Sequence, residues 1–161
     1  MEEKTYWDYR GSISYEYKGE TFYTITPIPY YYARRKSILK LIYNFISKRN
    51  CNKICDYGCG DGVYLSHLKQ MGLECDMCGI DISPEMIERA KMNCKDYDNI
   101  HFSLSEGKGI SCEEKYDCIY SSAVFAHVDD AIVETIFSDL EAHLNENNGY
   151  FCFVSRWEKN I

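Results

Sequence analysis

The sequence has little proline, no surplus of basic residues and no long apolar run, and each shortage excludes a class of protein. Only 3 of its 161 residues are proline and 10 are glycine, against 45% apolar residues, so the chain is neither collagenous nor of low complexity. Its 18 Lys and Arg are outnumbered by 25 Asp and Glu, which gives a formal charge of −7. Such a chain has no positive field with which to bind bulk nucleic acid or an anionic membrane surface.

Two further features are missing, a membrane-spanning run and an export leader. The most apolar run, 38–46, is short and is interrupted by Lys40 and Asn44. The first residues, Met-Glu-Glu-Lys, lack the basic and then apolar pattern of a signal peptide. We therefore expect one cytoplasmic domain that neither crosses nor binds a membrane.

Cysteine, by contrast, is abundant. The nine cysteines are an odd number in a chain without a leader, so we expect reduced thiols. The pair Cys75 and Cys78, or the run Cys51, Cys55 and Cys59, could be taken for metal ligands. However, a zinc site needs a second pair at comparable spacing, and the C-x3-C-x3-C run departs from the C-x3-C-x2-C motif of radical iron–sulfur enzymes. We therefore expect no metal site.

From about residue 50 onward, short apolar runs alternate with amphipathic segments, which is typical of βαβ units on a parallel sheet. The pattern predicts helices over 62–71, 84–94 and 129–144, and Ser83-Pro84 is a good start for the second of them. Five strands are predicted between and around the helices, over 53–57, 76–80, 100–104, 117–120 and 150–155. The expected architecture is a three-layer α/β domain.

The first part of the chain differs from the rest because aromatic residues are scattered through 6–9 and 21–32. A helix over 33–47 follows, with an apolar stripe that suits packing on the flank of the sheet. The aromatic segment is either a lid over a ligand pocket or a cover over a sheet face. We therefore divide the chain into an N-terminal extension with its flanking helix, 1–49, and a core, 50–161.

The segment from Ile54 to Leu65 carries the most chemical information, because an apolar strand runs through a glycine loop straight into a helix. Such a loop lets a ligand approach the main chain closely, and its N–H groups and the helix end can hold a carboxylate or a phosphate. A dinucleotide site requires G-x-G-x-x-G/A, but the third small position is occupied by Val63. The glycines fall instead as G-x-G-x-G, which disfavours a nicotinamide-dependent oxidoreductase.

A second signal follows the glycine loop. Asp81 ends the next apolar strand, 23 residues after Gly58. A carboxylate at the tip of the neighbouring strand can accept both hydroxyl groups of an adenosine ribose. The two features together, in this order and at this distance, indicate a nucleoside-containing cofactor.

These motifs resemble class I S-adenosylmethionine-dependent methyltransferases. Asp56-x-Gly58-x-Gly60-x-Gly62 is similar to their first motif, and Gly79-Ile-Asp81 to their acidic second motif. The stretches 99–107 and 116–128 resemble their third strand with its adenine loop, and their fourth strand with the loop after it. The resemblance covers about 50–155 and implies a Rossmann-like parallel sheet of five strands. The family's usual sixth and seventh strands are missing, which would leave a sheet edge for a homodimer or a partner chain to cover.

The resemblance also implies roles for individual residues. The methionine end of the cofactor, S-adenosylmethionine, would be held by Asp56 and by the backbone of Gly58, Cys59 and Gly60. Asp81 would bind the ribose hydroxyls and Ile82 would flank the adenine. Four further positions complete the implied site: Ser105 and Glu106 would lie near the adenine amino group, and Ser122 and Ala123 along the methionine end.

His127 is the candidate catalytic residue, because the loop after the fourth strand faces the transferred methyl group in the family and a neutral imidazole can accept a proton. Its alternative is a purely structural histidine. Arg34-Arg35-Lys36 could bind the cofactor carboxylate, but a charge run at a helix start is more often solvated. The resemblance implies methyl transfer to an oxygen or nitrogen of a small molecule. The alternative is a cofactor-binding subunit or incomplete fragment that needs a partner chain.

Overall fold

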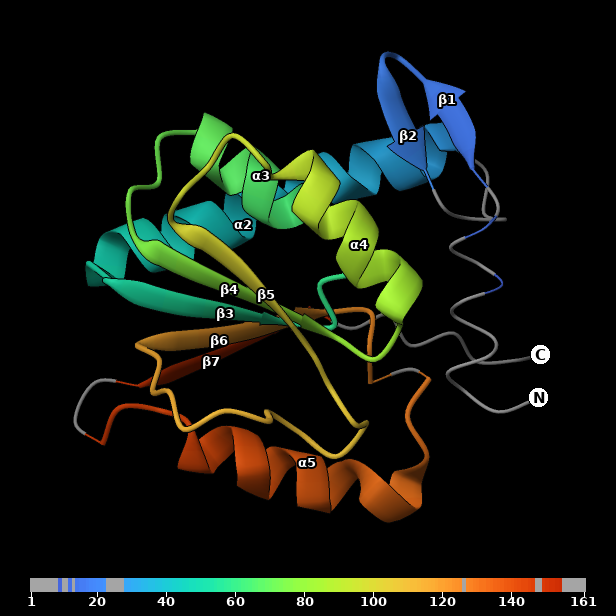
Figure 1. Cartoon of the computed structure of the whole chain (residues 1–161). Coiled ribbons are helices and arrows are strands. Elements are labelled where there is room, and N and C mark those ends of the chain that lie inside the picture. Colours follow the sequence, from blue (N-terminus) through green and yellow to red (C-terminus); the bar gives the residue numbers. More distant parts are fainter. Residues whose placement is uncertain are drawn as a thin grey trace.

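A computed structural model describes residues 9, 12, 14–22, 28–125, 127–146 and 149–154. Its centre is a five-stranded sheet in the order β5-β4-β3-β6-β7, and all four pairings are parallel (Figure 1). The strands are β3 Lys53–Tyr57, β4 Asp76–Asp81, β5 Ile100–Leu104, β6 Cys118–Ser122 and β7 Tyr150–Val154. The five predicted strands are confirmed, with shifts of one or two residues at their ends.

The strand order determines where a ligand can bind. The chain leaves β3 toward β4 and β5 on one side of the sheet, and later returns to β6 and β7 on the other side. The connections after β3 and β6 therefore diverge at the carboxyl ends of these two strands, where we expect a crevice. Open α/β sheets bind ligands at such a point.

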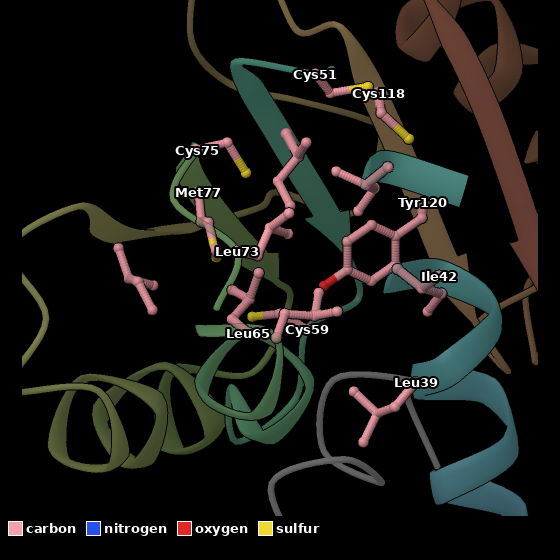
Figure 2. Close-up of a cluster of buried hydrophobic side chains, with 14 of the residues drawn as sticks. Leu39, Ile42, Cys51, Cys59, Leu65, Leu73, Cys75, Met77, Cys118 and Tyr120 are labelled. Atoms are coloured by element: carbon pink, nitrogen blue, oxygen red, sulfur yellow. The ribbon is translucent and has the colours of Figure 1, made fainter. Parts of the chain in front are cut away.

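Helices cover both faces of the sheet, so the predicted three-layer arrangement is confirmed. One face carries α2 Ile28–Arg49, α3 Val63–Gln70 and α4 Pro84–Asn93, and the other carries α5 Asp130–Ala142 (Figure 1). Alternate residues of β3 supply the two cores. Ile54 lies in the cluster with α2 and α3, shown in Figure 2, whereas Cys55 and Tyr57 lie in the cluster with α5.

Two helices begin at side-chain caps. Ser83, the predicted N-cap of α4, accepts a hydrogen bond from the Met86 N–H at 3.3 Å. Asp129 caps α5 and accepts from the Ala131 N–H at 2.9 Å. Each cap satisfies a backbone donor that a helix leaves without a partner in its first turn.

A short hairpin precedes α2, and the sequence pattern did not predict it. Its strands, β1 Tyr15–Tyr17 and β2 Glu20–Phe22, have three residues each, too few for a period-two pattern to stand out. The turn residues Lys18 and Gly19 both have positive φ, 52° and 78°, as in a type I′ turn. The Tyr17 ring packs edge-on against Tyr32 of α2 at 5.6 Å. Half of the aromatic segment for which a lid or a cover was expected, residues 6–8 and 23–27, lies outside the described residues.

The cysteines serve mainly as core residues. All eight whose side chains are described carry free thiols, and seven of them are buried. In the described part of the chain no group of three or more His, Cys, Asp or Glu side chains is arranged for a metal ion. Nor does any described helix combine the length and apolar character needed to cross a bilayer.

Candidate cofactor site

The glycine-rich loop after β3 folds back over the end of β4. Its glycines, Gly58, Gly60 and Gly62, all have positive φ, between 55° and 80°. The N–H groups of Gly58 and Cys59 both donate to the carbonyl of Ile80, at 2.7 and 2.9 Å. A Cβ placed on Gly60 would meet nothing within 4 Å, so the backbone here faces open space where a ligand can approach.

Asp81 joins the two sequence motifs directly. One of its carboxylate oxygens accepts from the Gly60 N–H at 2.8 Å, and the other accepts from the Ser83 N–H at 3.0 Å. The side chain is half-buried at the tip of β4. A carboxylate oxygen can accept more than one hydrogen bond, so a carboxylate at the tip of this strand is suited to bind the hydroxyl groups of a ribose.

Asp56 is unusual because its carboxyl group is buried in the interior. It is 1% exposed, and its Oδ2 atom has no hydrogen-bond partner among the described residues. Burial raises its pKa to about 8, and the charges of Asp81 and Asp61 add to the rise, whereas the Tyr120 hydroxyl opposes it. A buried carboxyl group with one oxygen that lacks a partner is suited to receive a cation from a ligand.

The side chain of Cys59 lies in the core, so the predicted role of Cys59 in the site would fall to its backbone. Its side chain is 4% exposed and belongs to the cluster beneath α2 and α3. A Cβ on Gly79 would lie 2.9 Å from its sulfur atom. Burial raises the pKa of the Cys59 thiol well above its usual value, so the thiol stays neutral within the core.

The predicted adenine side is formed by Ile82 and the loop after β5. A Cβ on Gly107 would lie 3.0 Å from Ile82 Cδ1, so the side chain and the loop backbone pack closely. The buried Ser105 hydroxyl donates to the Gly109 carbonyl at 2.8 Å and accepts from the Gly107 N–H at 3.0 Å, which gives it a role in shaping the loop. Glu106 is exposed, and contact of either residue with adenine stays a prediction.

The loop after β6 lies against the glycine loop. Ser122 and Ala123 are half-buried at its start, and Ala123 has a positive φ of 64°. Val124 packs so closely on Gly58 that a Cβ on Gly58 would come within 2.0 Å of it. His127 is exposed, and its backbone N–H donates to the Val124 carbonyl at 2.9 Å. The structure thus places the candidate base on the loop that borders the glycine turn.

The contact between Gly58 and Val124 leads to a stability prediction. We expect Gly58→Ala to lower the free energy of unfolding by about 1–3 kcal/mol more than Gly72→Ala, because the new methyl group must displace Val124. Gly72 is the matched control, since it also has a positive φ, 91°, but a Cβ there meets nothing within 4 Å. Urea denaturation measures both losses. Equal losses would mean that the strained backbone alone accounts for the effect.

Arg35 is buried, contrary to the interpretation that the sequence favoured. The run Arg34-Arg35-Lys36 was considered as a binder of the cofactor carboxylate, but a solvated face was favoured, and this is wrong for Arg35, which is only 4% exposed. Its charge lowers the pKa of Asp61 in the glycine loop, against the larger rise caused by burial. Helix α2 therefore places a buried guanidinium beside the loop.

Comparison with known proteins assigns the family. Residues 54–147, more than half of the chain, match a family model described as a methyltransferase domain. The chain is 34% identical over 84 residues to a malonyl-[acyl-carrier protein] O-methyltransferase of Ilyobacter polytropus, an alignment covering 52% of this chain and 31% of that protein. It is 30% identical over 117 residues to the ribosomal protein L11 methyltransferase of Campylobacter fetus, covering 71% and 38% respectively.

Solved structures share the fold. A complex of DhpI with S-adenosylhomocysteine has a TM-score of 0.69 at 22% identity, covering 92% of this chain and 65% of DhpI. The N-methyltransferase NodS of Bradyrhizobium japonicum, also solved with S-adenosylhomocysteine, has a TM-score of 0.65 at 22% identity, covering 78% and 61%. The chain spans about a third of the length of the curated relatives it matches.

The crevice and the family match define the class. The chain belongs to the class I S-adenosylmethionine-dependent methyltransferases, and the cofactor of this family is S-adenosylmethionine rather than a nicotinamide. The site fits that cofactor, because it offers a buried carboxyl oxygen without a partner at Asp56, open backbone at Gly60 and a carboxylate at the tip of β4.

Proposed function

We propose that this chain transfers a methyl group from S-adenosylmethionine to an oxygen or nitrogen atom of a small molecule. The observation that carries the proposal is Asp81, whose carboxylate accepts from the Gly60 N–H and so ties the glycine loop to β4. It supports the proposal because the carboxylate lies beside an open backbone turn, and the buried Asp56 is close enough for the Asp81 charge to raise its pKa. A cofactor with a sulfonium centre and an ammonium group suits such an acidic crevice.

Each part of the cofactor has a candidate partner. Asp56 would hold the ammonium group, Asp81 the ribose hydroxyls, and Ile82 with the loop after β5 would flank the adenine. The carboxylate needs a cation, because the N–H groups of Gly58, Cys59, Gly60 and Gly62 already donate to partners within the protein. Arg35 is the buried cation beside this loop, and a guanidinium pairs well with a carboxylate.

The cofactor supplies a methyl group that is already activated by a positively charged sulfur. The task left to the protein is to align an acceptor with that carbon and to remove a proton where the acceptor carries one. The loop between β6 and α5 borders the crevice and carries His127, which is exposed and whose backbone N–H donates to the Val124 carbonyl. A neutral imidazole there can take the proton from a hydroxyl or an amine.

A second candidate function is cofactor binding without turnover by this chain alone. It is favoured by the share of the curated relatives that the chain spans, 31% and 38%. A second copy or a partner chain would then complete the acceptor side and cover the sheet edge. The cytoplasm is the compartment we expect for either function.

Binding and turnover separate the two functions. We expect S-adenosylhomocysteine to bind in calorimetric titration and NAD, the control, not to bind. Release of S-adenosylhomocysteine from S-adenosylmethionine is then followed with oxygen and nitrogen nucleophiles, with wild type and His127→Ala side by side. The first function predicts turnover that His127→Ala slows at unchanged cofactor affinity. Binding without turnover on any acceptor would support the second function, and no binding would contradict both.

A further inference from the structure

Two buried polar groups without hydrogen-bond partners lie on neighbouring strands beside the glycine loop. Asp56 of β3 and Tyr120 of β6 are Cα partners in the parallel pairing. Tyr120 is 0% exposed and Asp56 is 1% exposed. Among the described residues, neither the Tyr120 hydroxyl nor Asp56 Oδ2 has a hydrogen-bond partner. Because paired residues on neighbouring strands project to the same face of a sheet, both side chains lie on the side of α2.

The hydroxyl group of Tyr120 is unfavourable for stability at its buried position. Its ring belongs to the apolar cluster beneath α2 and α3, and a buried hydroxyl without a partner destabilises the fold. Phenylalanine would fill the same space without that cost. Figure 2 shows the hydroxyl end of the ring directed toward Cys59 of the glycine loop. The destabilising hydroxyl of Tyr120 therefore lies where the glycine loop and Asp56 meet.

We propose that Tyr120 is a positioning residue for cofactor binding, whose hydroxyl donates to the Asp56 carboxylate when that carboxylate takes up the ammonium group of S-adenosylmethionine. The inference rests on the proposed function. A hydrogen bond to an ionised acceptor is roughly twice as strong as one between neutral groups. The hydroxyl therefore favours the ionised carboxylate that the ammonium group needs.

The other groups around Asp56 raise its pKa and so disfavour the ionised carboxylate. Burial raises its pKa most, and the charges of Asp81 on β4, Asp61 in the loop and Cys78 on β4 raise it further, whereas the Tyr120 hydroxyl lowers it. Two basic side chains near this region, Arg35 of α2 and His67 of α3, lower the pKa of Asp61. The thiols of Cys55 and Cys59 stay neutral because burial raises their pKa.

The test is the pH profile of S-adenosylhomocysteine affinity in Tyr120→Phe, measured by calorimetry from pH 6 to pH 9. We expect the rise of affinity with pH to lie at higher pH than in wild type, with binding at pH 7 weaker by about fivefold or more. Urea denaturation should show the variant to be at least as stable as wild type, because an unpartnered hydroxyl is removed. A merely structural tyrosine would not move the pH profile.

Tyr116→Phe is the matched control. Tyr116 is also 0% exposed, but it lies in the cluster on the α5 face, and its hydroxyl donates to Glu114 at 3.2 Å. That variant should lose stability and keep the wild-type pH profile. Tyr120→Leu serves as a second variant without the hydroxyl, should the phenylalanine repack the cluster.

The outcomes separate this inference from the proposed function. A profile in Tyr120→Phe and Tyr120→Leu that superimposes on that of wild type overturns the role of Tyr120, while cofactor binding stands. Wild type that binds no S-adenosylhomocysteine at any pH overturns the proposed function, and the role of Tyr120 falls with it.

Discussion

Asp81→Ala is expected to weaken the binding of S-adenosylhomocysteine at least tenfold. The substitution removes the acceptors for the ribose hydroxyls, and a hydrogen bond to a charged group contributes about 1.5–3 kcal/mol. It also frees the Gly60 N–H, which donates to Asp81 at 2.8 Å, so the glycine loop loses its tie to β4. Both losses act on binding, and calorimetric titration at one pH measures their sum.

Asp76→Ala is the control for this result. Asp76 begins the same strand that Asp81 ends, and it is exposed. It lies at the opposite edge of the sheet, so its removal should leave affinity unchanged. Unchanged affinity in Asp81→Ala would instead show that the ribose is bound elsewhere, and the assignment of the crevice would be wrong.

The strand before the glycine loop and the acid at the end of the next strand could be predicted from the sequence, because the signals for both are local. The strand from Lys53 to Tyr57 and the acid at the end of the next strand each stand out within a short window. Parallel pairing then brings their carboxyl ends to one edge, as the register of Asp56 with Gly79 confirms. The helix cap at Ser83 was likewise readable from two neighbouring residues.

The remaining features depend on contacts between segments far apart in the chain. Arg35 is buried because α2 docks over the glycine loop, and a charge run alone does not reveal that. The approach of Val124 to Gly58 depends on the path of the loop after β6. The pairing of Asp56 with Tyr120 depends on the position of β6 beside β3, 64 residues apart in the register. Such features require the tertiary structure.

The affinity of wild type for S-adenosylhomocysteine is expected to rise about fiftyfold between pH 6 and pH 8. Burial raises the pKa of Asp56 to about 8, so only about 1% of the free protein carries the ionised carboxylate at pH 6 and about half at pH 8. Apparent affinity scales with this competent fraction, because the ammonium group of the ligand binds the ionised form. Calorimetry at each pH, repeated in buffers of different ionisation enthalpy, also counts the proton released on binding.

Asp56→Asn provides the control, because an amide does not titrate. It should bind weakly at every pH and show no rise in affinity between pH 6 and pH 8.

The carboxyl group of Asp56 also makes the stability of wild type depend on pH, in the direction opposite to binding. Its pKa is raised from 3.8 in the unfolded chain to about 8 in the folded chain. The folded chain therefore keeps a proton that the unfolded chain has lost, and the free energy of unfolding falls as pH rises through that window. In Asp56→Asn this fall should be smaller, as urea denaturation at several pH values would show. An affinity of wild type that stays constant from pH 6 to pH 8 would mean that Asp56 is already ionised in the free protein or does not bind the ammonium group. A stability slope unchanged by Asp56→Asn would select the first explanation.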